Sequence, residues 1–316
     1  MKVYEIDKEF PKIKNPVLTL GTFDGVHLGH QKILRFLKEG ADRHEGETVL
    51  FTFFPHPRMV LHPDDHNLSL IQTIEKRIEM LDRFGLDNLI LYPFTKEFSR
   101  TPATEFIRDI MVNQLSVKMM TIGYNHHFGR NREGSIQLLE ELGHVYDFEV
   151  KEIPALRVEE KSISSTKIRN AILEGDILTA NEYLGRSFGF EGTVVQGNQI
   201  GSQIGFPTAN IDPKGPHQLI PEKGVYAVKA KIAGKIYSGM CNIGYRPTVT
   251  SSGERRIELH IFNFDQRIYG EELELFFINR IREEVEFASL DELKAQLKKD
   301  EESCRTILDV DSTPVH

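Results

Sequence analysis

Two histidines three residues apart, His27 and His30, lie in the segment GTFDGVHLGH. The apolar run Val17–Leu20 before it predicts a buried strand, and Gln31–Leu37 after it predicts an amphipathic helix. Glycines in this segment let the backbone turn sharply and approach a ligand, while the first amides of a helix are unpaired donors at the positive end of its dipole. Two imidazoles at such a junction can neutralise phosphate oxygens as charge moves onto a leaving group. The segment is therefore predicted to be a site of phosphate chemistry.

Two other interpretations of the histidine pair stay open. Histidines at this spacing could form half of a metal site, or either one could satisfy a loop carbonyl. No cysteine or carboxylate cluster at ligand spacing stands nearby. Glycine-flanked histidines at a strand-to-helix turn are also unusual in a loop without a function. Phosphate chemistry is therefore the favoured hypothesis.

The composition restricts the class of protein. The 316 residues include 39 Lys and Arg against 47 Asp and Glu, a net charge of −8, which argues against a nucleic-acid or anionic-membrane surface. The N-terminal segment lacks the apolar core of a signal peptide, and no apolar run approaches the ~18 residues of a membrane span. The two cysteines, Cys241 and Cys304, are too few for a disulfide framework, and Cys241 sits in an apolar run that predicts core packing. We expect a cytoplasmic protein that binds any anionic ligand through local positive groups.

The first half of the chain alternates short apolar runs with helical segments, which is typical of a parallel sheet with crossover helices. The predicted strands are the run at Val17, Thr48–Phe53, Leu89–Tyr92, Met119–Gly123 and Phe148–Ile153. Apolar residues at spacings of three and four predict covering helices at Ile71–Phe84 and Ala103–Leu115. Residues 1–185 are therefore predicted to form a doubly wound, Rossmann-like α/β domain whose ligands bind beyond the carboxyl ends of the strands.

After about residue 185 the pattern changes to short alternating strands, so residues 186–316 are predicted to form a second domain. The predicted strands are Phe190–Val195, Gly224–Ile232, Lys235–Ile243, Arg256–Phe264 and Leu273–Arg280. A hairpin turn is predicted at Ala233-Gly234, and a capping box at Ser289–Glu292 starts a final helix that runs to about Ile307. The expected fold is a small antiparallel β-barrel with a terminal helix packed across it.

Two further segments of the first half carry polar groups. The seven-residue segment ISSTKIR at Ile163–Arg169 precedes a helical run. Its hydroxyls can cap the helix or reach a phosphate, and Lys167 supplies positive charge. A Ser/Thr cluster at this place is most often only an N-cap, so that alternative stays open. The loop GYNHHFGRNREG at Gly123–Gly134 suits nucleotide recognition, although a solvated surface loop would look similar.

A glycine-rich stretch opens the second half. It runs through GTVVQG at Gly192–Gly197 to the sequence FPTAN at Phe206–Asn210. Glycines after a strand allow a loop to fold over phosphates, and the hydroxyl and amide oxygen that follow could ligate Mg²⁺. A β-bulge or a plain turn is equally compatible with these glycines. The stretch is not a Walker A loop, because the sequence contains no GxxxxGK[ST].

Three segments, GTFDGVHLGH, GYNHHFGRNREG and ISSTKIR, together resemble the nucleotidyltransferases of the HxGH class. With TFFPHPRMVLHP at Thr52–Pro63 and the GFPTAN stretch added, the chain resembles, in order and across nearly its whole length, the bacterial bifunctional riboflavin kinase/FAD synthetases. The resemblance implies that the second domain phosphorylates riboflavin to FMN with ATP, and that the first domain adenylates FMN to FAD with release of pyrophosphate. It implies Mg²⁺ as cofactor, ATP as co-substrate and flavins as substrates and products, with no nucleic-acid or membrane partner.

The resemblance also assigns roles to residues. The catalytic groups would be Glu258, His27 and His30. The residues that bind ATP for adenylyl transfer would be Gly21, Phe23, Asp24, Gly29, Asn125, Ser165, Thr166 and Arg169. The residues that bind ATP for the kinase would be Gly197, Gly201, Gly205, Thr208 and Asn210, with Thr208 and Asn210 also holding the metal. Ser202 stands where the family commonly has arginine, so one positive contact of the kinase site would be missing.

Other functions stay open. By itself Glu258 looks like an exposed strand glutamate paired with Arg255 or Arg256, on the face opposite Ile257 and Leu259. Another HxGH adenylyltransferase, acting on pantetheine phosphate or nicotinamide mononucleotide, would have no place for the GFPTAN barrel. A flavin-binding regulatory protein with a weakened kinase is the remaining alternative, and the presence of the histidines, SSTKIR and the PTAN residues speaks against it.

Overall fold

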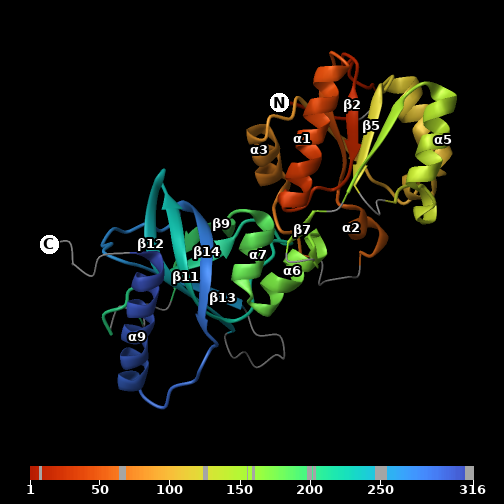
Figure 1. The fold of residues 1–316 in the computed structure, drawn as a ribbon. Coiled ribbons are helices and arrows are strands. Elements are labelled where there is room, and N and C mark those ends of the chain that lie inside the picture. Colours follow the sequence, from red (N-terminus) through yellow and green to blue (C-terminus); the bar gives the residue numbers. More distant parts are fainter. Residues whose placement is uncertain are drawn as a thin grey trace. The chain divides into compact units, whose positions relative to one another are not determined.

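The computed structural model describes residues 1–6, 9–63, 69–123, 127–154, 156–158, 161–197, 201, 204–245 and 255–309 (Figure 1). The chain divides into two compact units: one holds residues 1–68 and 74–165, and the other holds residues 69–73 and 166–316. Each unit has a core of its own. Among the described residues, no helix is long and apolar enough to cross a membrane.

The first unit is built on a six-stranded parallel sheet with the order β1-β4-β3-β2-β5-β6. Its strands are β1 (Lys2–Glu5), β2 (Val17–Leu20), β3 (Thr48–Phe54), β4 (Asn88–Pro93), β5 (Met119–Gly123) and β6 (Glu149–Ile153). The central strands are buried on both faces, which explains their continuous apolar runs. The chain passes from β2 outward to β3 and β4 and then returns to β5 on the other side of β2, so the strand order reverses beside β2.

Helices cover both faces of this sheet. The longer ones are α1 (Leu28–Arg43), α3 (Ile74–Arg83), the π-helical η2 (Phe106–Gln114) and α5 (Ile136–Tyr146). The short segments are α2 (Pro57–Leu61), η1 (Phe98–Arg100), α4 (Ala103–Glu105), η3 (Arg130–Arg132) and the pair β7 (Arg157–Val158) and β8 (Lys161–Ser162). Figure 1 shows α1 and α3 on one side of the sheet and α5 on the other. This arrangement confirms the predicted doubly wound class.

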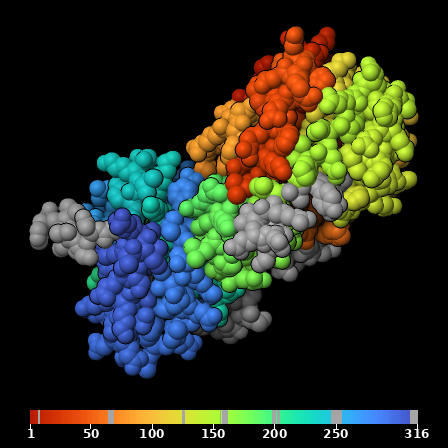
Figure 2. Space-filling model, in the orientation of Figure 1, coloured from red at the N-terminus to blue at the C-terminus, as the bar shows by residue number. Residues whose placement is uncertain are grey.

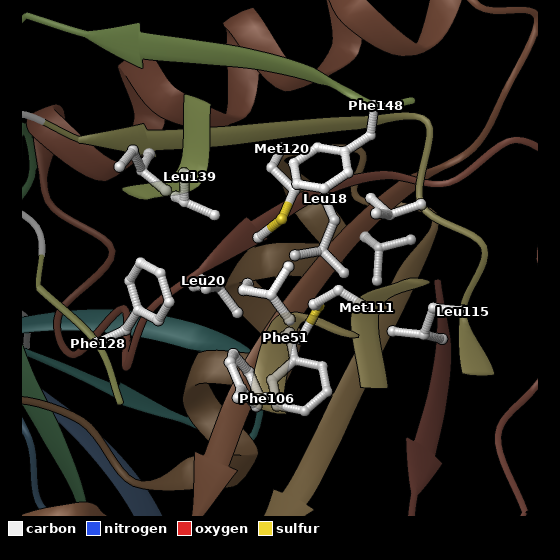
Figure 3. Packing of buried hydrophobic residues seen from close by; sticks show 14 of the residues in the cluster. Leu18, Leu20, Phe51, Phe106, Met111, Leu115, Met120, Phe128, Leu139 and Phe148 are labelled. Atoms are coloured by element: carbon white, nitrogen blue, oxygen red, sulfur yellow. The ribbon is translucent and has the colours of Figure 1, made fainter. Parts of the chain in front are cut away.

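The two faces have separate apolar clusters. On the α1 and α3 face, Leu37 and Leu81 pack with Leu50 of β3. On the other face, Phe51 packs with Phe106 of η2, and both rings lie at the centre of Figure 3. Because neighbouring residues of β3 point to opposite faces, a single strand contributes to both clusters.

Two of the predicted helices differ from the structure. The helix expected at Ile71–Phe84 begins at Ile74, because Leu70 is paired in a bridge with Gln218 and so extends the chain before the helix. The helix expected at Ala103–Leu115 is mostly wound as a π-helix. The exposed strand β1 was not predicted, because it has no buried apolar run.

The second unit is built on a closed antiparallel barrel with the order β10-β13-β12-β11-β14-β9. Its strands are β9 (Phe188–Val195), β10 (Ala209–Pro213), β11 (Gly224–Ile232), β12 (Lys235–Tyr245), β13 (Arg255–Ile261) and β14 (Glu272–Arg282). Ala233 and Gly234 form the predicted hairpin turn between β11 and β12, both with positive φ. Cys241 is fully buried in the barrel, and burial raises the pKa of its thiol, so the prediction of core packing is confirmed.

Helices α6 (Ser165–Glu174), α7 (Ile177–Leu184) and α9 (Leu290–Leu308) complete this unit. Helix α9 packs on the barrel through Cys304, beside Met240 of β12. Arg282 of β14 binds the carboxylate of Asp300 in α9 through two nitrogens, at 3.0 and 2.7 Å. The hydroxyl of Ser289 accepts from the N–H of Glu292 at 3.2 Å and caps the helix as predicted. The blue surface of α9 in Figure 2 shows its outer side facing solvent.

Replacing Phe51 by alanine is expected to lower the free energy of unfolding of the first unit by about 3–5 kcal/mol, because a large fully buried ring would leave a cavity. Hydrogen exchange of peptides from β2 to β5 in rising urea would measure the change. Phe84→Ala is the control, since that ring is 42 % exposed. Equal losses in both variants would contradict the prediction.

Candidate active sites

The first candidate site is the turn that joins β2 to α1. It follows the carboxyl end of β2, beside the reversal of strand order, which is where open parallel sheets bind ligands. The N–H of Gly21 donates to the carbonyl of Phe51 at 3.2 Å, so the turn begins bound to the neighbouring strand. Asp24 and His27 are only 1 % and 5 % exposed. The turn is thus hydrogen-bonded to the edge of the sheet, and its Asp24 and His27 side chains are buried.

Three rings of this turn form a stack. The ring centroids of Phe23 and His30 lie 4.3 Å apart, and those of His27 and His30 lie 3.6 Å apart. His27 is the N-cap of α1, and its Nδ1 accepts from the N–H of His30 at 3.3 Å. A neutral imidazole that accepts at Nδ1 carries its proton on Nε2, so His27 is a donor at that atom. His27 therefore adds a donor to a helix start, which is an arrangement suited to phosphate oxygens.

The backbone of the turn is strained. Phe23 and Val26 have φ values of +49° and +37°, in the left-handed region that side-chain-bearing residues rarely adopt. Each such residue costs on the order of 1–3 kcal/mol, so the surroundings must hold it. Gln31 of α1 does so in part, because its Nε2 donates to the carbonyl of Val26 at 3.0 Å. Gly29 lies close to His27, since a Cβ there would be 3.1 Å from the His27 ring.

An arginine below the turn supplies further support. The Nη1 of Arg77, in α3, donates to the carbonyl of Thr22 at 2.8 Å, and its Nη2 lies 3.6 Å from Oδ1 of Asp24. The two side chains are 3 % and 1 % exposed. Burial lowers the pKa of Arg77, and the nearby charge of Asp24 opposes that shift.

The ISSTKIR segment forms the start of α6. Ser165 is the first residue of this helix, and its Oγ donates to the carbonyl of Asp24 at 2.8 Å, which joins the second motif to the first. Thr166 is exposed on the following turn. The Nε of Arg169 donates to the carbonyl of Ser69 at 2.8 Å. The hydroxyl of Ser165 therefore binds the turn after β2.

Two predicted positions lie outside the described residues, namely Asn125 and Ser202. Of the loop that contains Asn125, the structure describes the later part. There Phe128 and Gly134 are joined by two backbone hydrogen bonds of 3.2 and 2.8 Å. Arg130 lies 3.7 Å from Glu133, which makes its exposed charge part of an ion pair.

The second candidate site lies on the barrel, where β10, β13 and β12 are side by side. Asn210 stands opposite Glu258, and Glu258 stands opposite Asn242 on its other side. Directly opposed residues share one face of a sheet, so these three polar side chains form a row. Ile257 and Leu259 are 3 % and 1 % exposed and point to the other face, as the alternation predicted.

Glu258 has a positive neighbour in its own strand. Its Oε1 lies 3.6 Å from Nη1 of Arg256, and the two side chains are 28 % and 26 % exposed. The pairing considered from the sequence is therefore present with Arg256. It leaves the carboxylate open to solvent and, at this distance and exposure, contributes little stability.

The segment that leads into β10 is held by His260 of β13. The Nδ1 of His260 lies 2.7 Å from the carbonyl oxygen of Pro207, and it must donate because the carbonyl can only accept. The pKa of His260 is lowered, chiefly by burial and also by Arg305, while the Pro207 bond and Glu301 oppose the shift. Because Thr208 follows Pro207, this contact orders the backbone beside Thr208.

Glycines bring the preceding loop close to the same segment. A Cβ on Gly197 would lie 1.9 Å from Nδ2 of Asn210, and one on Gly201 would lie 2.2 Å from the carbonyl oxygen of Phe206. Gly205 has a φ of +87°, a conformation that favours glycine. Close approach to backbone thus requires glycine at 201, the backbone angle favours it at 205, and a side chain at 197 would displace Asn210.

The side chains available as metal ligands differ between the two candidate sites. Among the described residues there is no group of three or more His, Cys, Asp and Glu side chains that could hold a metal ion. The row on the barrel offers oxygen donors instead, from Asn210 and Glu258, with Thr208 just before β10. Oxygen donors completed by substrate phosphates are the usual environment of Mg²⁺. The chemistry of the barrel site therefore fits this ion.

Three residues of the sites were not predicted. Arg77 sits in the amphipathic pattern of α3 at a buried position, and a charge on the apolar face of a helix is a signal that could have drawn attention to it. Asn242 alternates with Cys241 and Ile243, so strand periodicity alone puts it on the face of Glu258. His260 offers no such signal, because its partner is the backbone of a distant loop.

Comparisons with known proteins agree with two catalytic domains. The family model described as FAD synthetase matches residues 10–167, and the family model described as riboflavin kinase matches residues 184–308. The sheet unit and the barrel unit thus contain an FAD synthetase domain and a riboflavin kinase domain, respectively, which defines a two-domain flavin-metabolising class.

Relatives that contain both domains are similar over nearly their whole length. A bifunctional riboflavin kinase/FMN adenylyltransferase of Buchnera aphidicola (subsp. Schizaphis graminum) is 40 % identical, with 90 % of this chain and 92 % of the relative covered. The protein of the same description from Escherichia coli K12 is 36 % identical, with 92 % and 91 % covered. The chain belongs to the bifunctional riboflavin kinase/FMN adenylyltransferase family, and the resemblance predicted from its motifs is confirmed.

A solved structure has the same fold over nearly the whole chain. It is described as a macrolide-efflux protein from Streptococcus pneumoniae, and it matches with a TM-score of 0.87 at 34 % identity. The match covers 96 % of this chain and 99 % of the other. Both units are therefore present together in a protein of known structure.

Replacing His260 by glutamine is expected to flatten the pH dependence of barrel stability. The folded state lowers the pKa of His260, so its contribution is present above the unfolded value of about 6.5 and is lost as the pH falls through the lower folded value. Glutamine keeps a donor for Pro207 but does not titrate. Urea unfolding of both proteins from about pH 7.5 to pH 5 measures the difference, and parallel curves would refute the assignment.

Proposed function

We propose that this chain phosphorylates riboflavin to FMN in the barrel domain and adenylates FMN to FAD in the sheet domain. The observation that carries the proposal is the presence of both family domains in one chain. The functional boundary is proposed at residue 185, with 1–185 as FMN adenylyltransferase and 186–316 as riboflavin kinase. The partners are the small molecules riboflavin, FMN and ATP.

In the kinase reaction, Glu258 accepts the proton of the ribityl hydroxyl as its oxygen attacks the γ-phosphorus of ATP. The bond between this phosphorus and the β–γ bridging oxygen breaks, and ADP leaves. The position of Glu258 opposite Asn210 supports this role, since the base must lie beside the groups that hold ATP. The glycines 197, 201 and 205 allow the loop to approach the phosphates.

Mg²⁺ is proposed as the cofactor of this step, held by the hydroxyl of Thr208 and the amide oxygen of Asn210. When bound, the ion neutralises charge on the ATP phosphates. The hydrogen bond between His260 and Pro207 holds the backbone beside Thr208. Asn210 is kept at the loop by its close packing with Gly197.

In the adenylyl transfer, a phosphate oxygen of FMN attacks the α-phosphorus of ATP, and the α–β bridging bond breaks to release pyrophosphate. His27, His30, Ser165 and Thr166 hold the triphosphate, and Arg169 binds the departing phosphates. The remaining proposed ATP contacts are Gly21, Phe23, Asp24, Gly29 and Asn125. The stacked imidazoles at the start of α1 support this assignment, because they lie at a helix N-terminus, where anions are favoured.

We also propose that the enzyme works in the cytoplasm. Both cysteines are buried and unpaired as disulfides, with the pKa of Cys304 raised by burial to about 12. Thiols in this state suit a reducing compartment.

The double variant His27→Ala/His30→Ala is expected to slow FAD formation by about 100- to 1000-fold, because donors to the developing charge are removed. FMN formation from riboflavin should continue and FMN should accumulate. Chromatography of products from riboflavin and Mg-ATP measures both. The control is His144→Ala, an exposed histidine of α5. A loss of both activities in the double variant would count against separable sites.

The variant Glu258→Gln is expected to slow FMN formation by about 100- to 10,000-fold, because glutamine cannot take the hydroxyl proton. Conversion of supplied FMN to FAD should stay at the wild-type rate. Glu272→Gln is the matched control, since this strand glutamate of the same barrel has a side chain that is 74 % exposed. Full kinase activity in Glu258→Gln would exclude Glu258 as the base.

A further inference from the structure

Arg77 is an unusual residue for a helix that covers a sheet. Its side chain is 3 % exposed, and it sits in α3 on the same side as the buried Met80 and Leu81. Its guanidinium reaches the turn after β2, donating to the carbonyl of Thr22 at 2.8 Å and lying 3.6 Å from the carboxylate of Asp24. A buried charge at this place needs a physical reason.

Stability of the fold does not supply that reason. Taking an arginine and an aspartate out of water is costly, and such pairs are often no more stable than apolar side chains of similar volume. The Nε of Arg77 is also buried and has no hydrogen-bond partner in the described part of the chain. The position of the Arg77 side chain is therefore better explained by the backbone that it binds than by a contribution to the stability of the core.

What it holds is a strained piece of backbone. Thr22 and Asp24 flank Phe23, whose φ is +49°. The Phe23 ring stacks on His30 at 4.3 Å, and His30 stacks on His27 at 3.6 Å. A change in the backbone at Phe23 would thus move the ring on which His30 stacks, and through His30 it would shift His27.

The turn that Arg77 holds is also bound to the ISSTKIR segment. The carbonyl of Asp24 accepts from Oγ of Ser165 at 2.8 Å, at the first residue of α6. By holding Asp24, Arg77 therefore also fixes the carbonyl that accepts from the Ser165 hydroxyl. Both groups of triphosphate contacts proposed for this unit depend on the position of one short turn.

We propose that Arg77 is a positioning residue for adenylyl transfer, which clamps the turn Thr22–Asp24 and thereby aligns His30, His27 and Ser165. The proposal rests on the adenylyl-transfer function proposed above for this site. Arg77 is assigned a positioning role because its buried guanidinium contacts Thr22 and Asp24 of the turn. Its effect on the reaction passes through the geometry of the turn.

The test is the variant Arg77→Lys in the full-length chain. Lysine keeps the positive charge but has a single head group, which cannot reach the Thr22 carbonyl and the Asp24 carboxylate in the same way as the arginine fork. The control is Arg83→Lys in the same helix, whose side chain is 64 % exposed and paired with Glu79. FMN formation by the same molecules reports on the other unit.

We expect Arg77→Lys to lower kcat for FAD formation from FMN and Mg-ATP by about 10- to 100-fold, with a much smaller change in KM for ATP. FMN formation and Arg83→Lys should match the wild type. Hydrogen exchange should become faster in the peptide covering residues 21–30, while protection of the β2, β3 and β5 strands is unchanged. This combination separates positioning from a general loss of structure.

Wild-type kcat in Arg77→Lys would overturn the proposal. So would loss of protection across β2, β3 and β5, because Arg77 would then be a residue of the core. If the wild-type chain forms no FAD, the proposed function itself fails. The exchange of residues 21–30 would in that case still decide whether Arg77 orders the turn.

Discussion

Parallel strands bring their carboxyl ends to one edge of a sheet, and the order of the strands decides where that edge opens for a ligand. In the first unit the order reverses beside β2, and the turn after β2 must fit between its neighbours within a few residues. It does so by placing Phe23 and Val26 at positive φ. Such a turn persists only when other groups hold it. Most features of the first candidate site follow from this requirement.

The groups that hold the turn come from three directions. Gln31 reaches back from α1, Ser165 reaches from the start of α6, and Arg77 reaches up from α3. Each binds a backbone carbonyl, so their effect depends on the shape of the turn and not on the side chains it displays. The histidine side chains therefore stay available for a ligand while these three residues hold the backbone of the turn.

The barrel meets a different requirement, since a closed sheet must fill its interior with alternate residues and leaves the others for the outer face. Leu259 goes inward, and Glu258 beside it goes outward into a row with Asn210 and Asn242. The loop before β10 is then drawn to this row by glycines without side chains and by His260. The two candidate sites thus differ in construction, because the first is built on a helix start and the second on a glycine-containing loop beside a sheet.

Much of this organisation could be predicted from residue patterns. The central strands β2 to β5 were predicted because burial on both faces leaves a continuous apolar run, whereas β1 is exposed and has no such run. The start of α3 was predicted three residues too early, since the bridge between Leu70 and Gln218 joins residues far apart in the chain. Local periodicity carries no information about such a pairing.

The sequence by itself determined the two fold classes, the motif residues and the family, because these depend on residue types and on spacing along the chain. Only the tertiary structure decided that Asn210 stands opposite Glu258, that Ser165 binds Asp24, that His260 holds Pro207 and that Arg77 supports the turn. Each of these contacts joins segments separated by dozens of residues. Their partners are set by strand register and helix packing, which arise only when the whole unit has folded.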